Sequence, residues 1–282
     1  MSALPFIRLL GTAAVAETWH DTPAHDVPPR RLALLALLAL AGSDGIVRAR
    51  VASLLWPREQ SERANPMLDE LLSALRSELG DGAVIETGAL LRLDTSRVIV
   101  DVVEFERAAN DGDLERAAEL YEGEFLEGFF LEDAVDFEQW ASDQRLRLTS
   151  RAARVLEQLA TDAHDRGEIA AAIALLRRRA DLEPYAAEPT LALMHALEAS
   201  GDAHEALRAG RTYESRIRTF LETDPAPEVL SETRRLRAIV GPAATPATGT
   251  PTAGSPGPGL PNGAAGVAPG LRDELRGRGD KR

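Results

Sequence analysis

The chain has 282 residues, of which 44% are hydrophobic and 27% are charged, so it is long enough for two globular domains. It contains no cysteine, which excludes disulfides and thiolate metal sites, and its net charge of −13 argues against indiscriminate nucleic-acid binding. The charge is uneven: residues 1–101 carry −3, residues 102–240 carry −12, and residues 241–282 carry +2.

The chain also lacks the marks of a secreted or membrane protein. Its N-terminus has no basic start before the first apolar run, so no signal peptide is expected. The longest apolar stretch, residues 32–41, is about half the length that a membrane-spanning helix needs. We therefore expect a soluble, cytoplasmic protein without membrane contact.

The first elements predicted are a strand and a helix. Residues 6–15 alternate loosely between apolar and polar side chains and indicate a strand with a bend at Gly11. Pro29 then pre-sets the start of a helix, which is apolar nearly all round and ends at Gly42. A helix with this pattern is expected to be buried.

Two further helices follow, joined by a polar link that contains proline. The first is predicted over Arg48–Leu55. The second buries one leucine stripe, formed by Leu68, Leu71, Leu72, Leu75 and Leu79. Its start is predicted at Ser61 as a cap, or at Asn65 with Pro66 as the first helical residue. Its end is predicted at Gly80, in the left-handed conformation.

Beyond this helix pair, two alternating runs around a turn near Glu86 to Gly88 indicate a β-hairpin. The order of strand, helices and hairpin is typical of a winged helix-turn-helix, in which the second helix of the pair enters the DNA major groove and the hairpin is the wing. The alternative is that the two helices belong to the core of an ordinary small α domain.

From residue 102 onward the chain is helical and repetitive. Gly167-Glu168 and Gly201-Asp202 are 34 residues apart, which is the tetratricopeptide period. Ala172 and Ala206 then occupy the small-residue position at which the helices of a repeat pack closely. This spacing predicts stacked helical hairpins with a concave groove, and the alternative is a simple helical bundle.

The residues after Val240 are rich in proline, glycine and alanine, so we expect a disordered tail. The predicted fold class is mainly α with a small β wing. It comprises a winged helix at 1–100, a tetratricopeptide-like domain at 101–240 and the tail at 241–282.

No motif for catalysis or for cofactor binding is present. The phosphate-binding pattern GxxxxGK[ST] is absent, and the only lysine is Lys281. The five histidines show no ligand spacing. We therefore expect neither an enzyme nor a metal or cofactor site.

Several motifs, taken in this order, resemble those of SARP-type bacterial transcriptional activators. They are LLG at 9–11, RRLALLALL at 30–38, LLWP at 54–57, SALRSELG at 73–80, YEGEFLEGF at 121–129 and FEQW at 137–140. The resemblance covers about residues 6–240. It implies a response-regulator-like winged helix followed by a bacterial transcriptional activator domain, and a protein that binds direct repeats in promoter DNA as a dimer and contacts RNA polymerase.

The residues expected to contact DNA are Arg48, Arg50, Arg63, Asn65, Ser73, Arg76 and Arg92. Ser73 and Arg76 are implied by the resemblance, whereas the others lie on exposed helix positions, at the start of the preceding helix or on the wing. Each arginine has an alternative interpretation as an ordinary surface cation.

Three positions depart from the pattern of the family. Asp69 and Ala74 stand where members commonly hold basic residues, and Pro66 is unusual. A carboxylate near phosphate weakens binding, and among base edges it suits only the amino group of cytosine. The alternative function is therefore a protein-interaction module whose winged helix binds DNA weakly or not at all.

Overall fold

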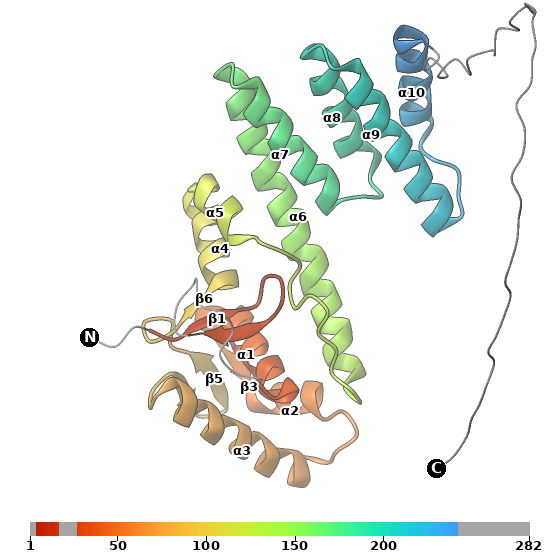
Figure 1. Cartoon of the computed structure of the whole chain (residues 1–282). Coiled ribbons are helices and arrows are strands. Elements are labelled where there is room, and N and C mark those ends of the chain that lie inside the picture. The colour runs from red at the N-terminus through yellow and green to blue at the C-terminus, as the bar shows by residue number, and fades with distance from the viewer. Residues whose placement is uncertain (1–3, 17–26, 242–282) are drawn as a thin grey trace, which may run out of the picture. The chain divides into compact units, whose positions relative to one another are not determined.

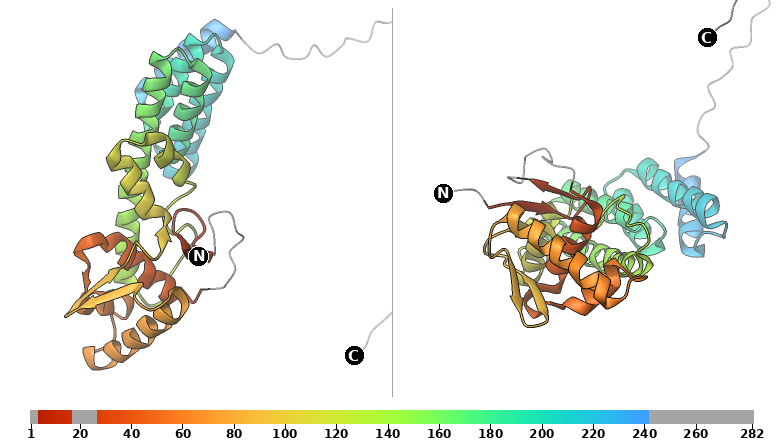
Figure 2. Two further views of the ribbon diagram at one scale, coloured as in Figure 1. Left: turned by 90° about the vertical axis from the view of Figure 1, so that its left-hand side faces the viewer. Right: turned by 90° about the horizontal axis from the view of Figure 1, so that it is seen from below.

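The computed structural model describes residues 4–16 and 27–241 and is mainly helical with two small sheets, which confirms the predicted fold class (Figures 1 and 2). The tail predicted from residue 241 lies, apart from Gly241 itself, outside the described residues. In chain order the elements are β1 (Phe6–Arg8), β2 (Ala14–Ala16), α1 (Pro29–Ala41), η1 (Gly42–Asp44), β3 (Ile46–Val47), α2 (Arg48–Leu55), α3 (Ser61–Leu79), β4 (Val84–Thr87), β5 (Leu90–Leu93), β6 (Ile99–Val100), α4 (Asp101–Asp111), α5 (Leu114–Leu120), α6 (Val135–Asp165), α7 (Ile169–Leu182), α8 (Ala187–Ala199), α9 (Ala203–Arg216), η2 (Ile217–Leu221) and α10 (Pro227–Val240).

The first sheet is formed by β1 with strands that precede and follow the helices α1 to α3. β1 pairs antiparallel with β2, where Phe6 faces Ala16, and parallel with β6, where Phe6 faces Ile99. The prediction of one bent strand over residues 6–15 is therefore wrong. The chain instead reverses between β1 and β2 around Gly11, whose φ of +87° is readily adopted only by glycine.

The helix α3 buries four leucines of the predicted stripe and half-buries the fifth, Leu71, but its ends differ from the prediction. It begins at Ser61, and the preceding Gln60 occupies the cap position without a side-chain hydrogen bond. Pro66 lies inside the helix, so a start at Asn65 is wrong, and the proline leaves a main-chain carbonyl one turn earlier without its usual helical donor. Gly80 has a positive φ of 94° but a ψ of 151°, so it ends the helix in an extended rather than a left-handed helical conformation.

The second sheet contains the predicted hairpin, with Arg92 on its second strand. β4 and β5 are joined by the two residues Gly88 and Ala89, and Gly88 has a φ of +61°. β3 adds a third strand antiparallel to β5, and the Arg48 N–H donates to the Ala89 carbonyl at 2.8 Å. The hairpin is thereby fastened to the start of α2, so the wing and the helix pair form one unit.

The remaining helices pack as successive hairpins, and each contacts the next along the chain from α6 to α10. Gly167 and Gly201 both follow the first helix of a pair with positive φ values, 78° and 91°. Ala172 and Ala206, at the predicted small-residue positions, are buried, at 4% and 0% exposed. None of the helices in the described ranges combines the length and apolarity that a membrane span requires.

The loop after β1 contacts the segment that joins α5 to α6. The Gly11 N–H donates to the Glu124 carbonyl and the Leu126 N–H donates to the Leu9 carbonyl, both at 2.8 Å. A Cβ atom on Gly123 would lie 2.8 Å from the Cα of Gly11, so this approach requires glycine. The LLG and YEGEFL motifs, predicted to lie in different domains, therefore meet through their backbones.

Asp101 makes a second connection of this kind at the start of α4. Its carboxylate is 1% exposed and accepts the backbone N–H groups of Leu9, Leu10 and Val102 at 2.6–2.8 Å. Burial raises the pKa of Asp101 to about 7, although the three N–H donors and nearby Arg8 act in the opposite direction. The carboxylate thus accepts hydrogen bonds from the backbone N–H groups of Leu9 and Leu10, just after the end of β1.

Buried side chains form one continuous cluster from Ile7 to Leu159, which crosses the predicted domain boundary at residue 100. A second cluster runs from Leu193 to Leu236 within the last helices. Residue 100 therefore marks a change in the kind of secondary structure within a shared core.

Capping by Asp202 provides a small, local test of the helical hairpins. Its side chain accepts the Glu205 N–H at 3.0 Å at the start of α9. Asp202→Ala should lower the free energy of unfolding by about 1 kcal/mol, the usual cost of losing such a cap. Chemical denaturation followed by circular dichroism measures this loss. Asp202→Asn, which keeps an oxygen acceptor, is the control, and an equal loss in both variants would contradict the role of the cap.

Candidate DNA-binding surface

The outer face of α3 is polar because the leucine stripe occupies the inner face. Asn65 and Ser73 lie exposed on this face, and Arg63 is exposed at 3.8 Å from Glu59. The charged residues of the helix are Glu62, Arg63, Asp69, Glu70, Arg76 and Glu78. Four carboxylates against two guanidinium groups give α3 a net charge of −2, which opposes contact with phosphate.

Arg48, at the first position of α2, is held by two carboxylates. Its guanidinium lies 2.5 Å from Asp69 of α3 and 2.7 Å from Glu86 of β4, and its side chain is 19% exposed. Burial alone would lower the pKa of Arg48, but the two carboxylates outweigh it and raise that pKa. The ion pairs of Arg48 therefore connect α2, α3 and β4.

Glu86 also pairs with Arg76, at 3.1 Å, from near the C-terminal end of α3. The four side chains Arg48, Asp69, Glu86 and Arg76 form a chain of alternating charge, which we call the surface ion network. Two of the arginines predicted to contact DNA are thus bound to carboxylates of the same protein. They reach phosphate only by exchanging these partners.

Two more of the predicted arginines lie apart from this network. Arg50 on α2 and Arg92 on β5 are both exposed. Neither forms an ion pair within the part of the chain that the structure describes. Over α2, α3 and the hairpin together, five arginines face five carboxylates, so the surface is electrically neutral.

The structure gives the three unusual positions distinct surroundings. Asp69 is the partner of Arg48, so its charge is balanced within the protein. Ala74 is half-buried on α3, so this position is less accessible than the exposed Ser73 beside it. Pro66 is exposed on the outer face of α3.

The comparisons with known proteins identify the second half of the chain. Residues 93–237, just over half of the chain, match the family described as the bacterial transcriptional activator domain. The chain belongs to this family. The resemblance to SARP-type regulators is thereby confirmed.

A solved structure shows the same fold. It is Mycobacterium tuberculosis EmbR in complex with a low-affinity phosphopeptide, at 21% sequence identity and a TM-score of 0.55. The match covers 83% of this chain and 65% of the EmbR chain. The present chain therefore spans just under two thirds of the length of EmbR. A search of curated protein sequences found no match.

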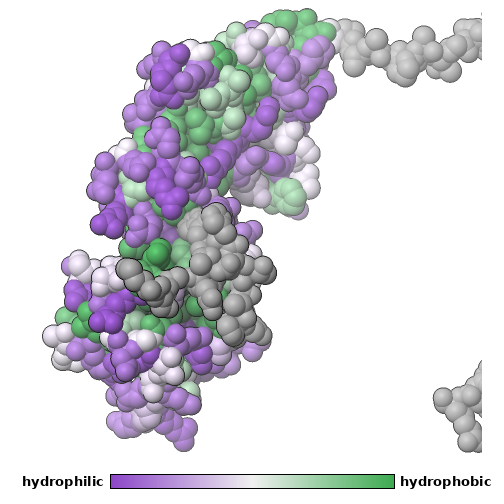
Figure 3. Space-filling model, turned by 60° about the vertical axis from the view of Figure 1, so that its left-hand side comes forward, coloured by the Kyte–Doolittle hydropathy of each residue, from purple (hydrophilic) through white to green (hydrophobic). Residues whose placement is uncertain are grey.

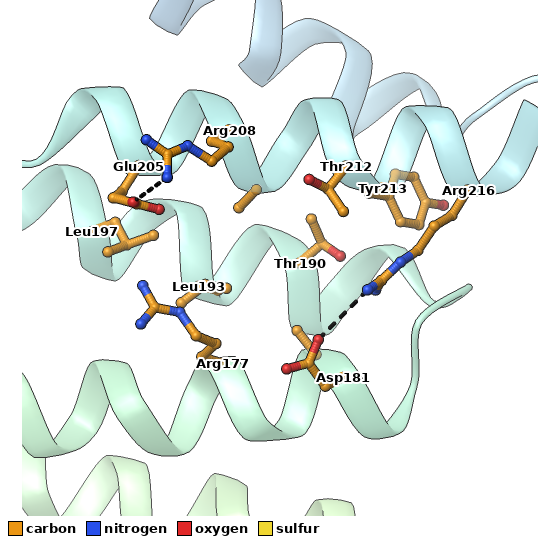
Figure 4. Close-up of a pocket in the computed structure, with 12 residues that line it drawn as sticks. Arg177, Asp181, Thr190, Leu193, Leu197, Glu205, Arg208, Thr212, Tyr213 and Arg216 are labelled. Carbon is orange, nitrogen blue, oxygen red and sulfur yellow. Dashed lines mark ion pairs between the residues drawn. The ribbon is translucent and has the colours of Figure 1, made fainter.

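The activator domain has a small polar hollow over α7, α8 and α9 (Figure 4). Its volume is about 190 Å³, and its charged lining is largely paired: Arg208 lies 2.8 Å from Glu205, and Arg216 lies 3.7 Å from Asp181.

Figure 3 shows that hydrophobic surface lies between hydrophilic bands over the helical part.

Sequence reasoning found the arginines of the surface but missed their partner Glu86. Its role depends on how the hairpin lies against α2 and α3, and no periodicity in a single sequence reports that packing. Asp69 was noticed, but as a residue facing DNA and not as the counter-ion of Arg48.

Proposed function

We propose that this protein binds promoter DNA sequence-specifically, with α3 in the major groove and the β4–β5 hairpin against the backbone. The observation that carries the proposal is the arrangement of α3, a 19-residue helix with a buried leucine stripe and an exposed polar face beside a hairpin that bears Arg92. Such a helix and wing are the elements that winged helices present to duplex DNA. The helical domain then serves dimerisation and contact with RNA polymerase, and the protein acts in the cytoplasm.

The charge balance supports a particular mode of binding. Because Arg48 and Arg76 are paired with Asp69 and Glu86, few cations are free to displace counter-ions from DNA. A single subunit is then a weak binder at any sequence. Two subunits on adjacent direct repeats gain affinity through effective concentration, without new contacts.

A protein-interaction module is the second candidate function. The neutral surface formed by α2, α3 and the hairpin favours it, because phosphate binding rewards excess positive charge. In this case the helical domain holds a partner protein and the winged helix only positions it.

Binding of the purified full-length protein to a genomic DNA pool separates the two candidates. Selection at several salt concentrations should enrich a few sites that contain direct repeats, with affinity that falls as salt rises. Recovery of DNA without any enriched sequence, at every salt concentration, would favour the interaction module.

Arg76 provides a residue-level test of the proposed surface. Arg76→Ala should weaken specific binding by about 1 kcal/mol, the lower end of the range for a base or phosphate contact, because the arginine must first leave Glu86. Fluorescence anisotropy on a selected site measures the change. Arg107→Ala, an exposed arginine on α4, is the control, and unchanged binding by Arg76→Ala would remove Arg76 from the surface.

A further inference from the structure

A cavity of about 460 Å³ opens between α6, α7 and α8, away from the winged helix. Its walls are mostly apolar and include Ile169, Ile173 and Leu176 of α7 with small alanines of the three helices. Because alanines line it from three sides, the helices approach without filling the space between them. A volume of this size is in the range of pockets that bury small ligands.

One end of the cavity is strongly acidic. Arg179 is 8% exposed and is surrounded by three carboxylates, those of Glu157 at 3.4 Å, Glu183 at 3.8 Å and Glu188 at 3.1 Å with a second, shorter contact. One guanidinium therefore faces three negative charges. The Nε atom of Arg179 is buried and has no hydrogen-bond partner in the described part of the chain.

Two of these carboxylates also line the cavity and remain accessible. The side chains of Glu157 and Glu188 are 50% and 65% exposed, respectively, so each retains room for another donor. Glu188 already binds Arg179 through both oxygens, which leaves the guanidinium little capacity for an anion from outside. The excess charge at this end is negative.

We propose that this cavity binds a small amphipathic cation, an organic ammonium or guanidinium with an apolar body. The apolar body fills the space against Ile173 and Leu176, and the cationic head lies at the exposed carboxylates of Glu157 and Glu188. Burial of the body supplies the affinity, and the two carboxylates select the sign of the charge. The size of the cavity suits a small molecule and not a folded segment of protein.

The site is placed where a ligand can affect regulation. α6 lines the cavity with Glu157 and also contacts α2, the first helix of the DNA-facing pair. A ligand that orders the α6–α7–α8 group acts on a helix shared with the winged helix. The binding proposal itself is independent of DNA binding and is tested without DNA.

Three eight-carbon probes test the charge preference on the full-length chain: octylammonium, octanoate and 1-octanol. Titration calorimetry at pH 8 should give one saturable site for octylammonium. Octanoate should bind at least about ten-fold more weakly, because the excess negative charge at this end repels it. Equal binding of octylammonium and octanoate would overturn the proposal.

Variants then locate the site. Ala196→Phe, on the α8 wall, should abolish binding of octylammonium and 1-octanol, whereas Ala171→Phe, exposed on α7 outside the cavity, should not. Glu157→Gln should weaken octylammonium several-fold and leave 1-octanol unchanged. Circular dichroism confirms folding, and the exposed Glu157 serves as the test if Ala196→Phe does not fold. Full binding by Glu157→Gln, or by a folded Ala196→Phe, would show that the probe lies elsewhere.

Discussion

Asp101→Ala should lower the free energy of unfolding by roughly 3–9 kcal/mol, since three buried N–H groups lose their acceptor at about 1–3 kcal/mol each. These are the groups of Leu9, Leu10 and Val102, which surround a carboxylate that is only 1% exposed. A loss of this size is a large fraction of the stability of a typical domain. Urea denaturation followed by circular dichroism measures it.

The control is Asp113→Ala, which removes an exposed cap that accepts one N–H, from Arg116. It should cost only about 1 kcal/mol. If both variants lose the same amount, Asp101 contributes no more than an ordinary cap, and its hydrogen bonds to the end of β1 are unimportant for stability.

The raised pKa of Asp101 adds a pH dependence with a definite sign. The ordinary pKa of the carboxyl is 3.8, and its pKa in the folded protein is about 7. At pH values between these two, the carboxyl is protonated to a greater extent in the folded protein than in the unfolded chain. The contribution of Asp101 to stability therefore falls as pH rises through this window and is constant above it. Compared with Asp101→Asn, which does not titrate, the wild type should lose stability between pH 5 and pH 8. An unchanged difference across that range would contradict the raised pKa.

The second large effect is a gain of DNA affinity when the surface ion network is broken. The double variant Asp69→Asn and Glu86→Gln removes two carboxylates and frees Arg48 and Arg76 to meet phosphate. Binding to a non-specific duplex should tighten by about 10–100-fold at low salt, and the slope of log affinity against log salt should steepen by about 2. Anisotropy titrations over a salt series measure both quantities.

A matched double variant separates released arginines from removed charge. Glu62→Gln with Glu70→Gln removes two exposed carboxylates from the same helix, α3, but releases no arginine. It should tighten binding less and change the slope little. Equal behaviour of the two double variants would show that the network does not restrain Arg48 and Arg76.

The sequence predicts the elements of this fold well where periodicity is strong. The leucine stripe of α3 and the 34-residue spacing of Gly167 and Gly201 both correspond to buried faces and helix ends in the structure. Pro66 misled the prediction of the helix start, because proline is tolerated on an exposed face when the rest of the helix packs well.

The candidate surface was only partly predictable. Arg48 and Arg76 were found as cations on helix positions, but whether a cation is free depends on a carboxylate that is distant in sequence. Glu86 lies on a strand 38 residues after Arg48, and the pairing arises from packing of the hairpin against α2. The role of Asp101 was not predicted, because nothing in the neighbouring sequence indicates that its carboxylate accepts hydrogen bonds from Leu9 and Leu10.

The backbone contact between Gly11 and Gly123 constrains both the folding of this protein during synthesis and the exchange of its domains with those of relatives. During synthesis, the first strand leaves the ribosome more than a hundred residues before the segment that completes its surroundings, so it stays unpaired on that side until then. For the same reason, a chimera that takes the winged helix from one relative and the helical domain from another must match both glycine loops. Gene fusion at residue 100 would exchange two halves that share one core.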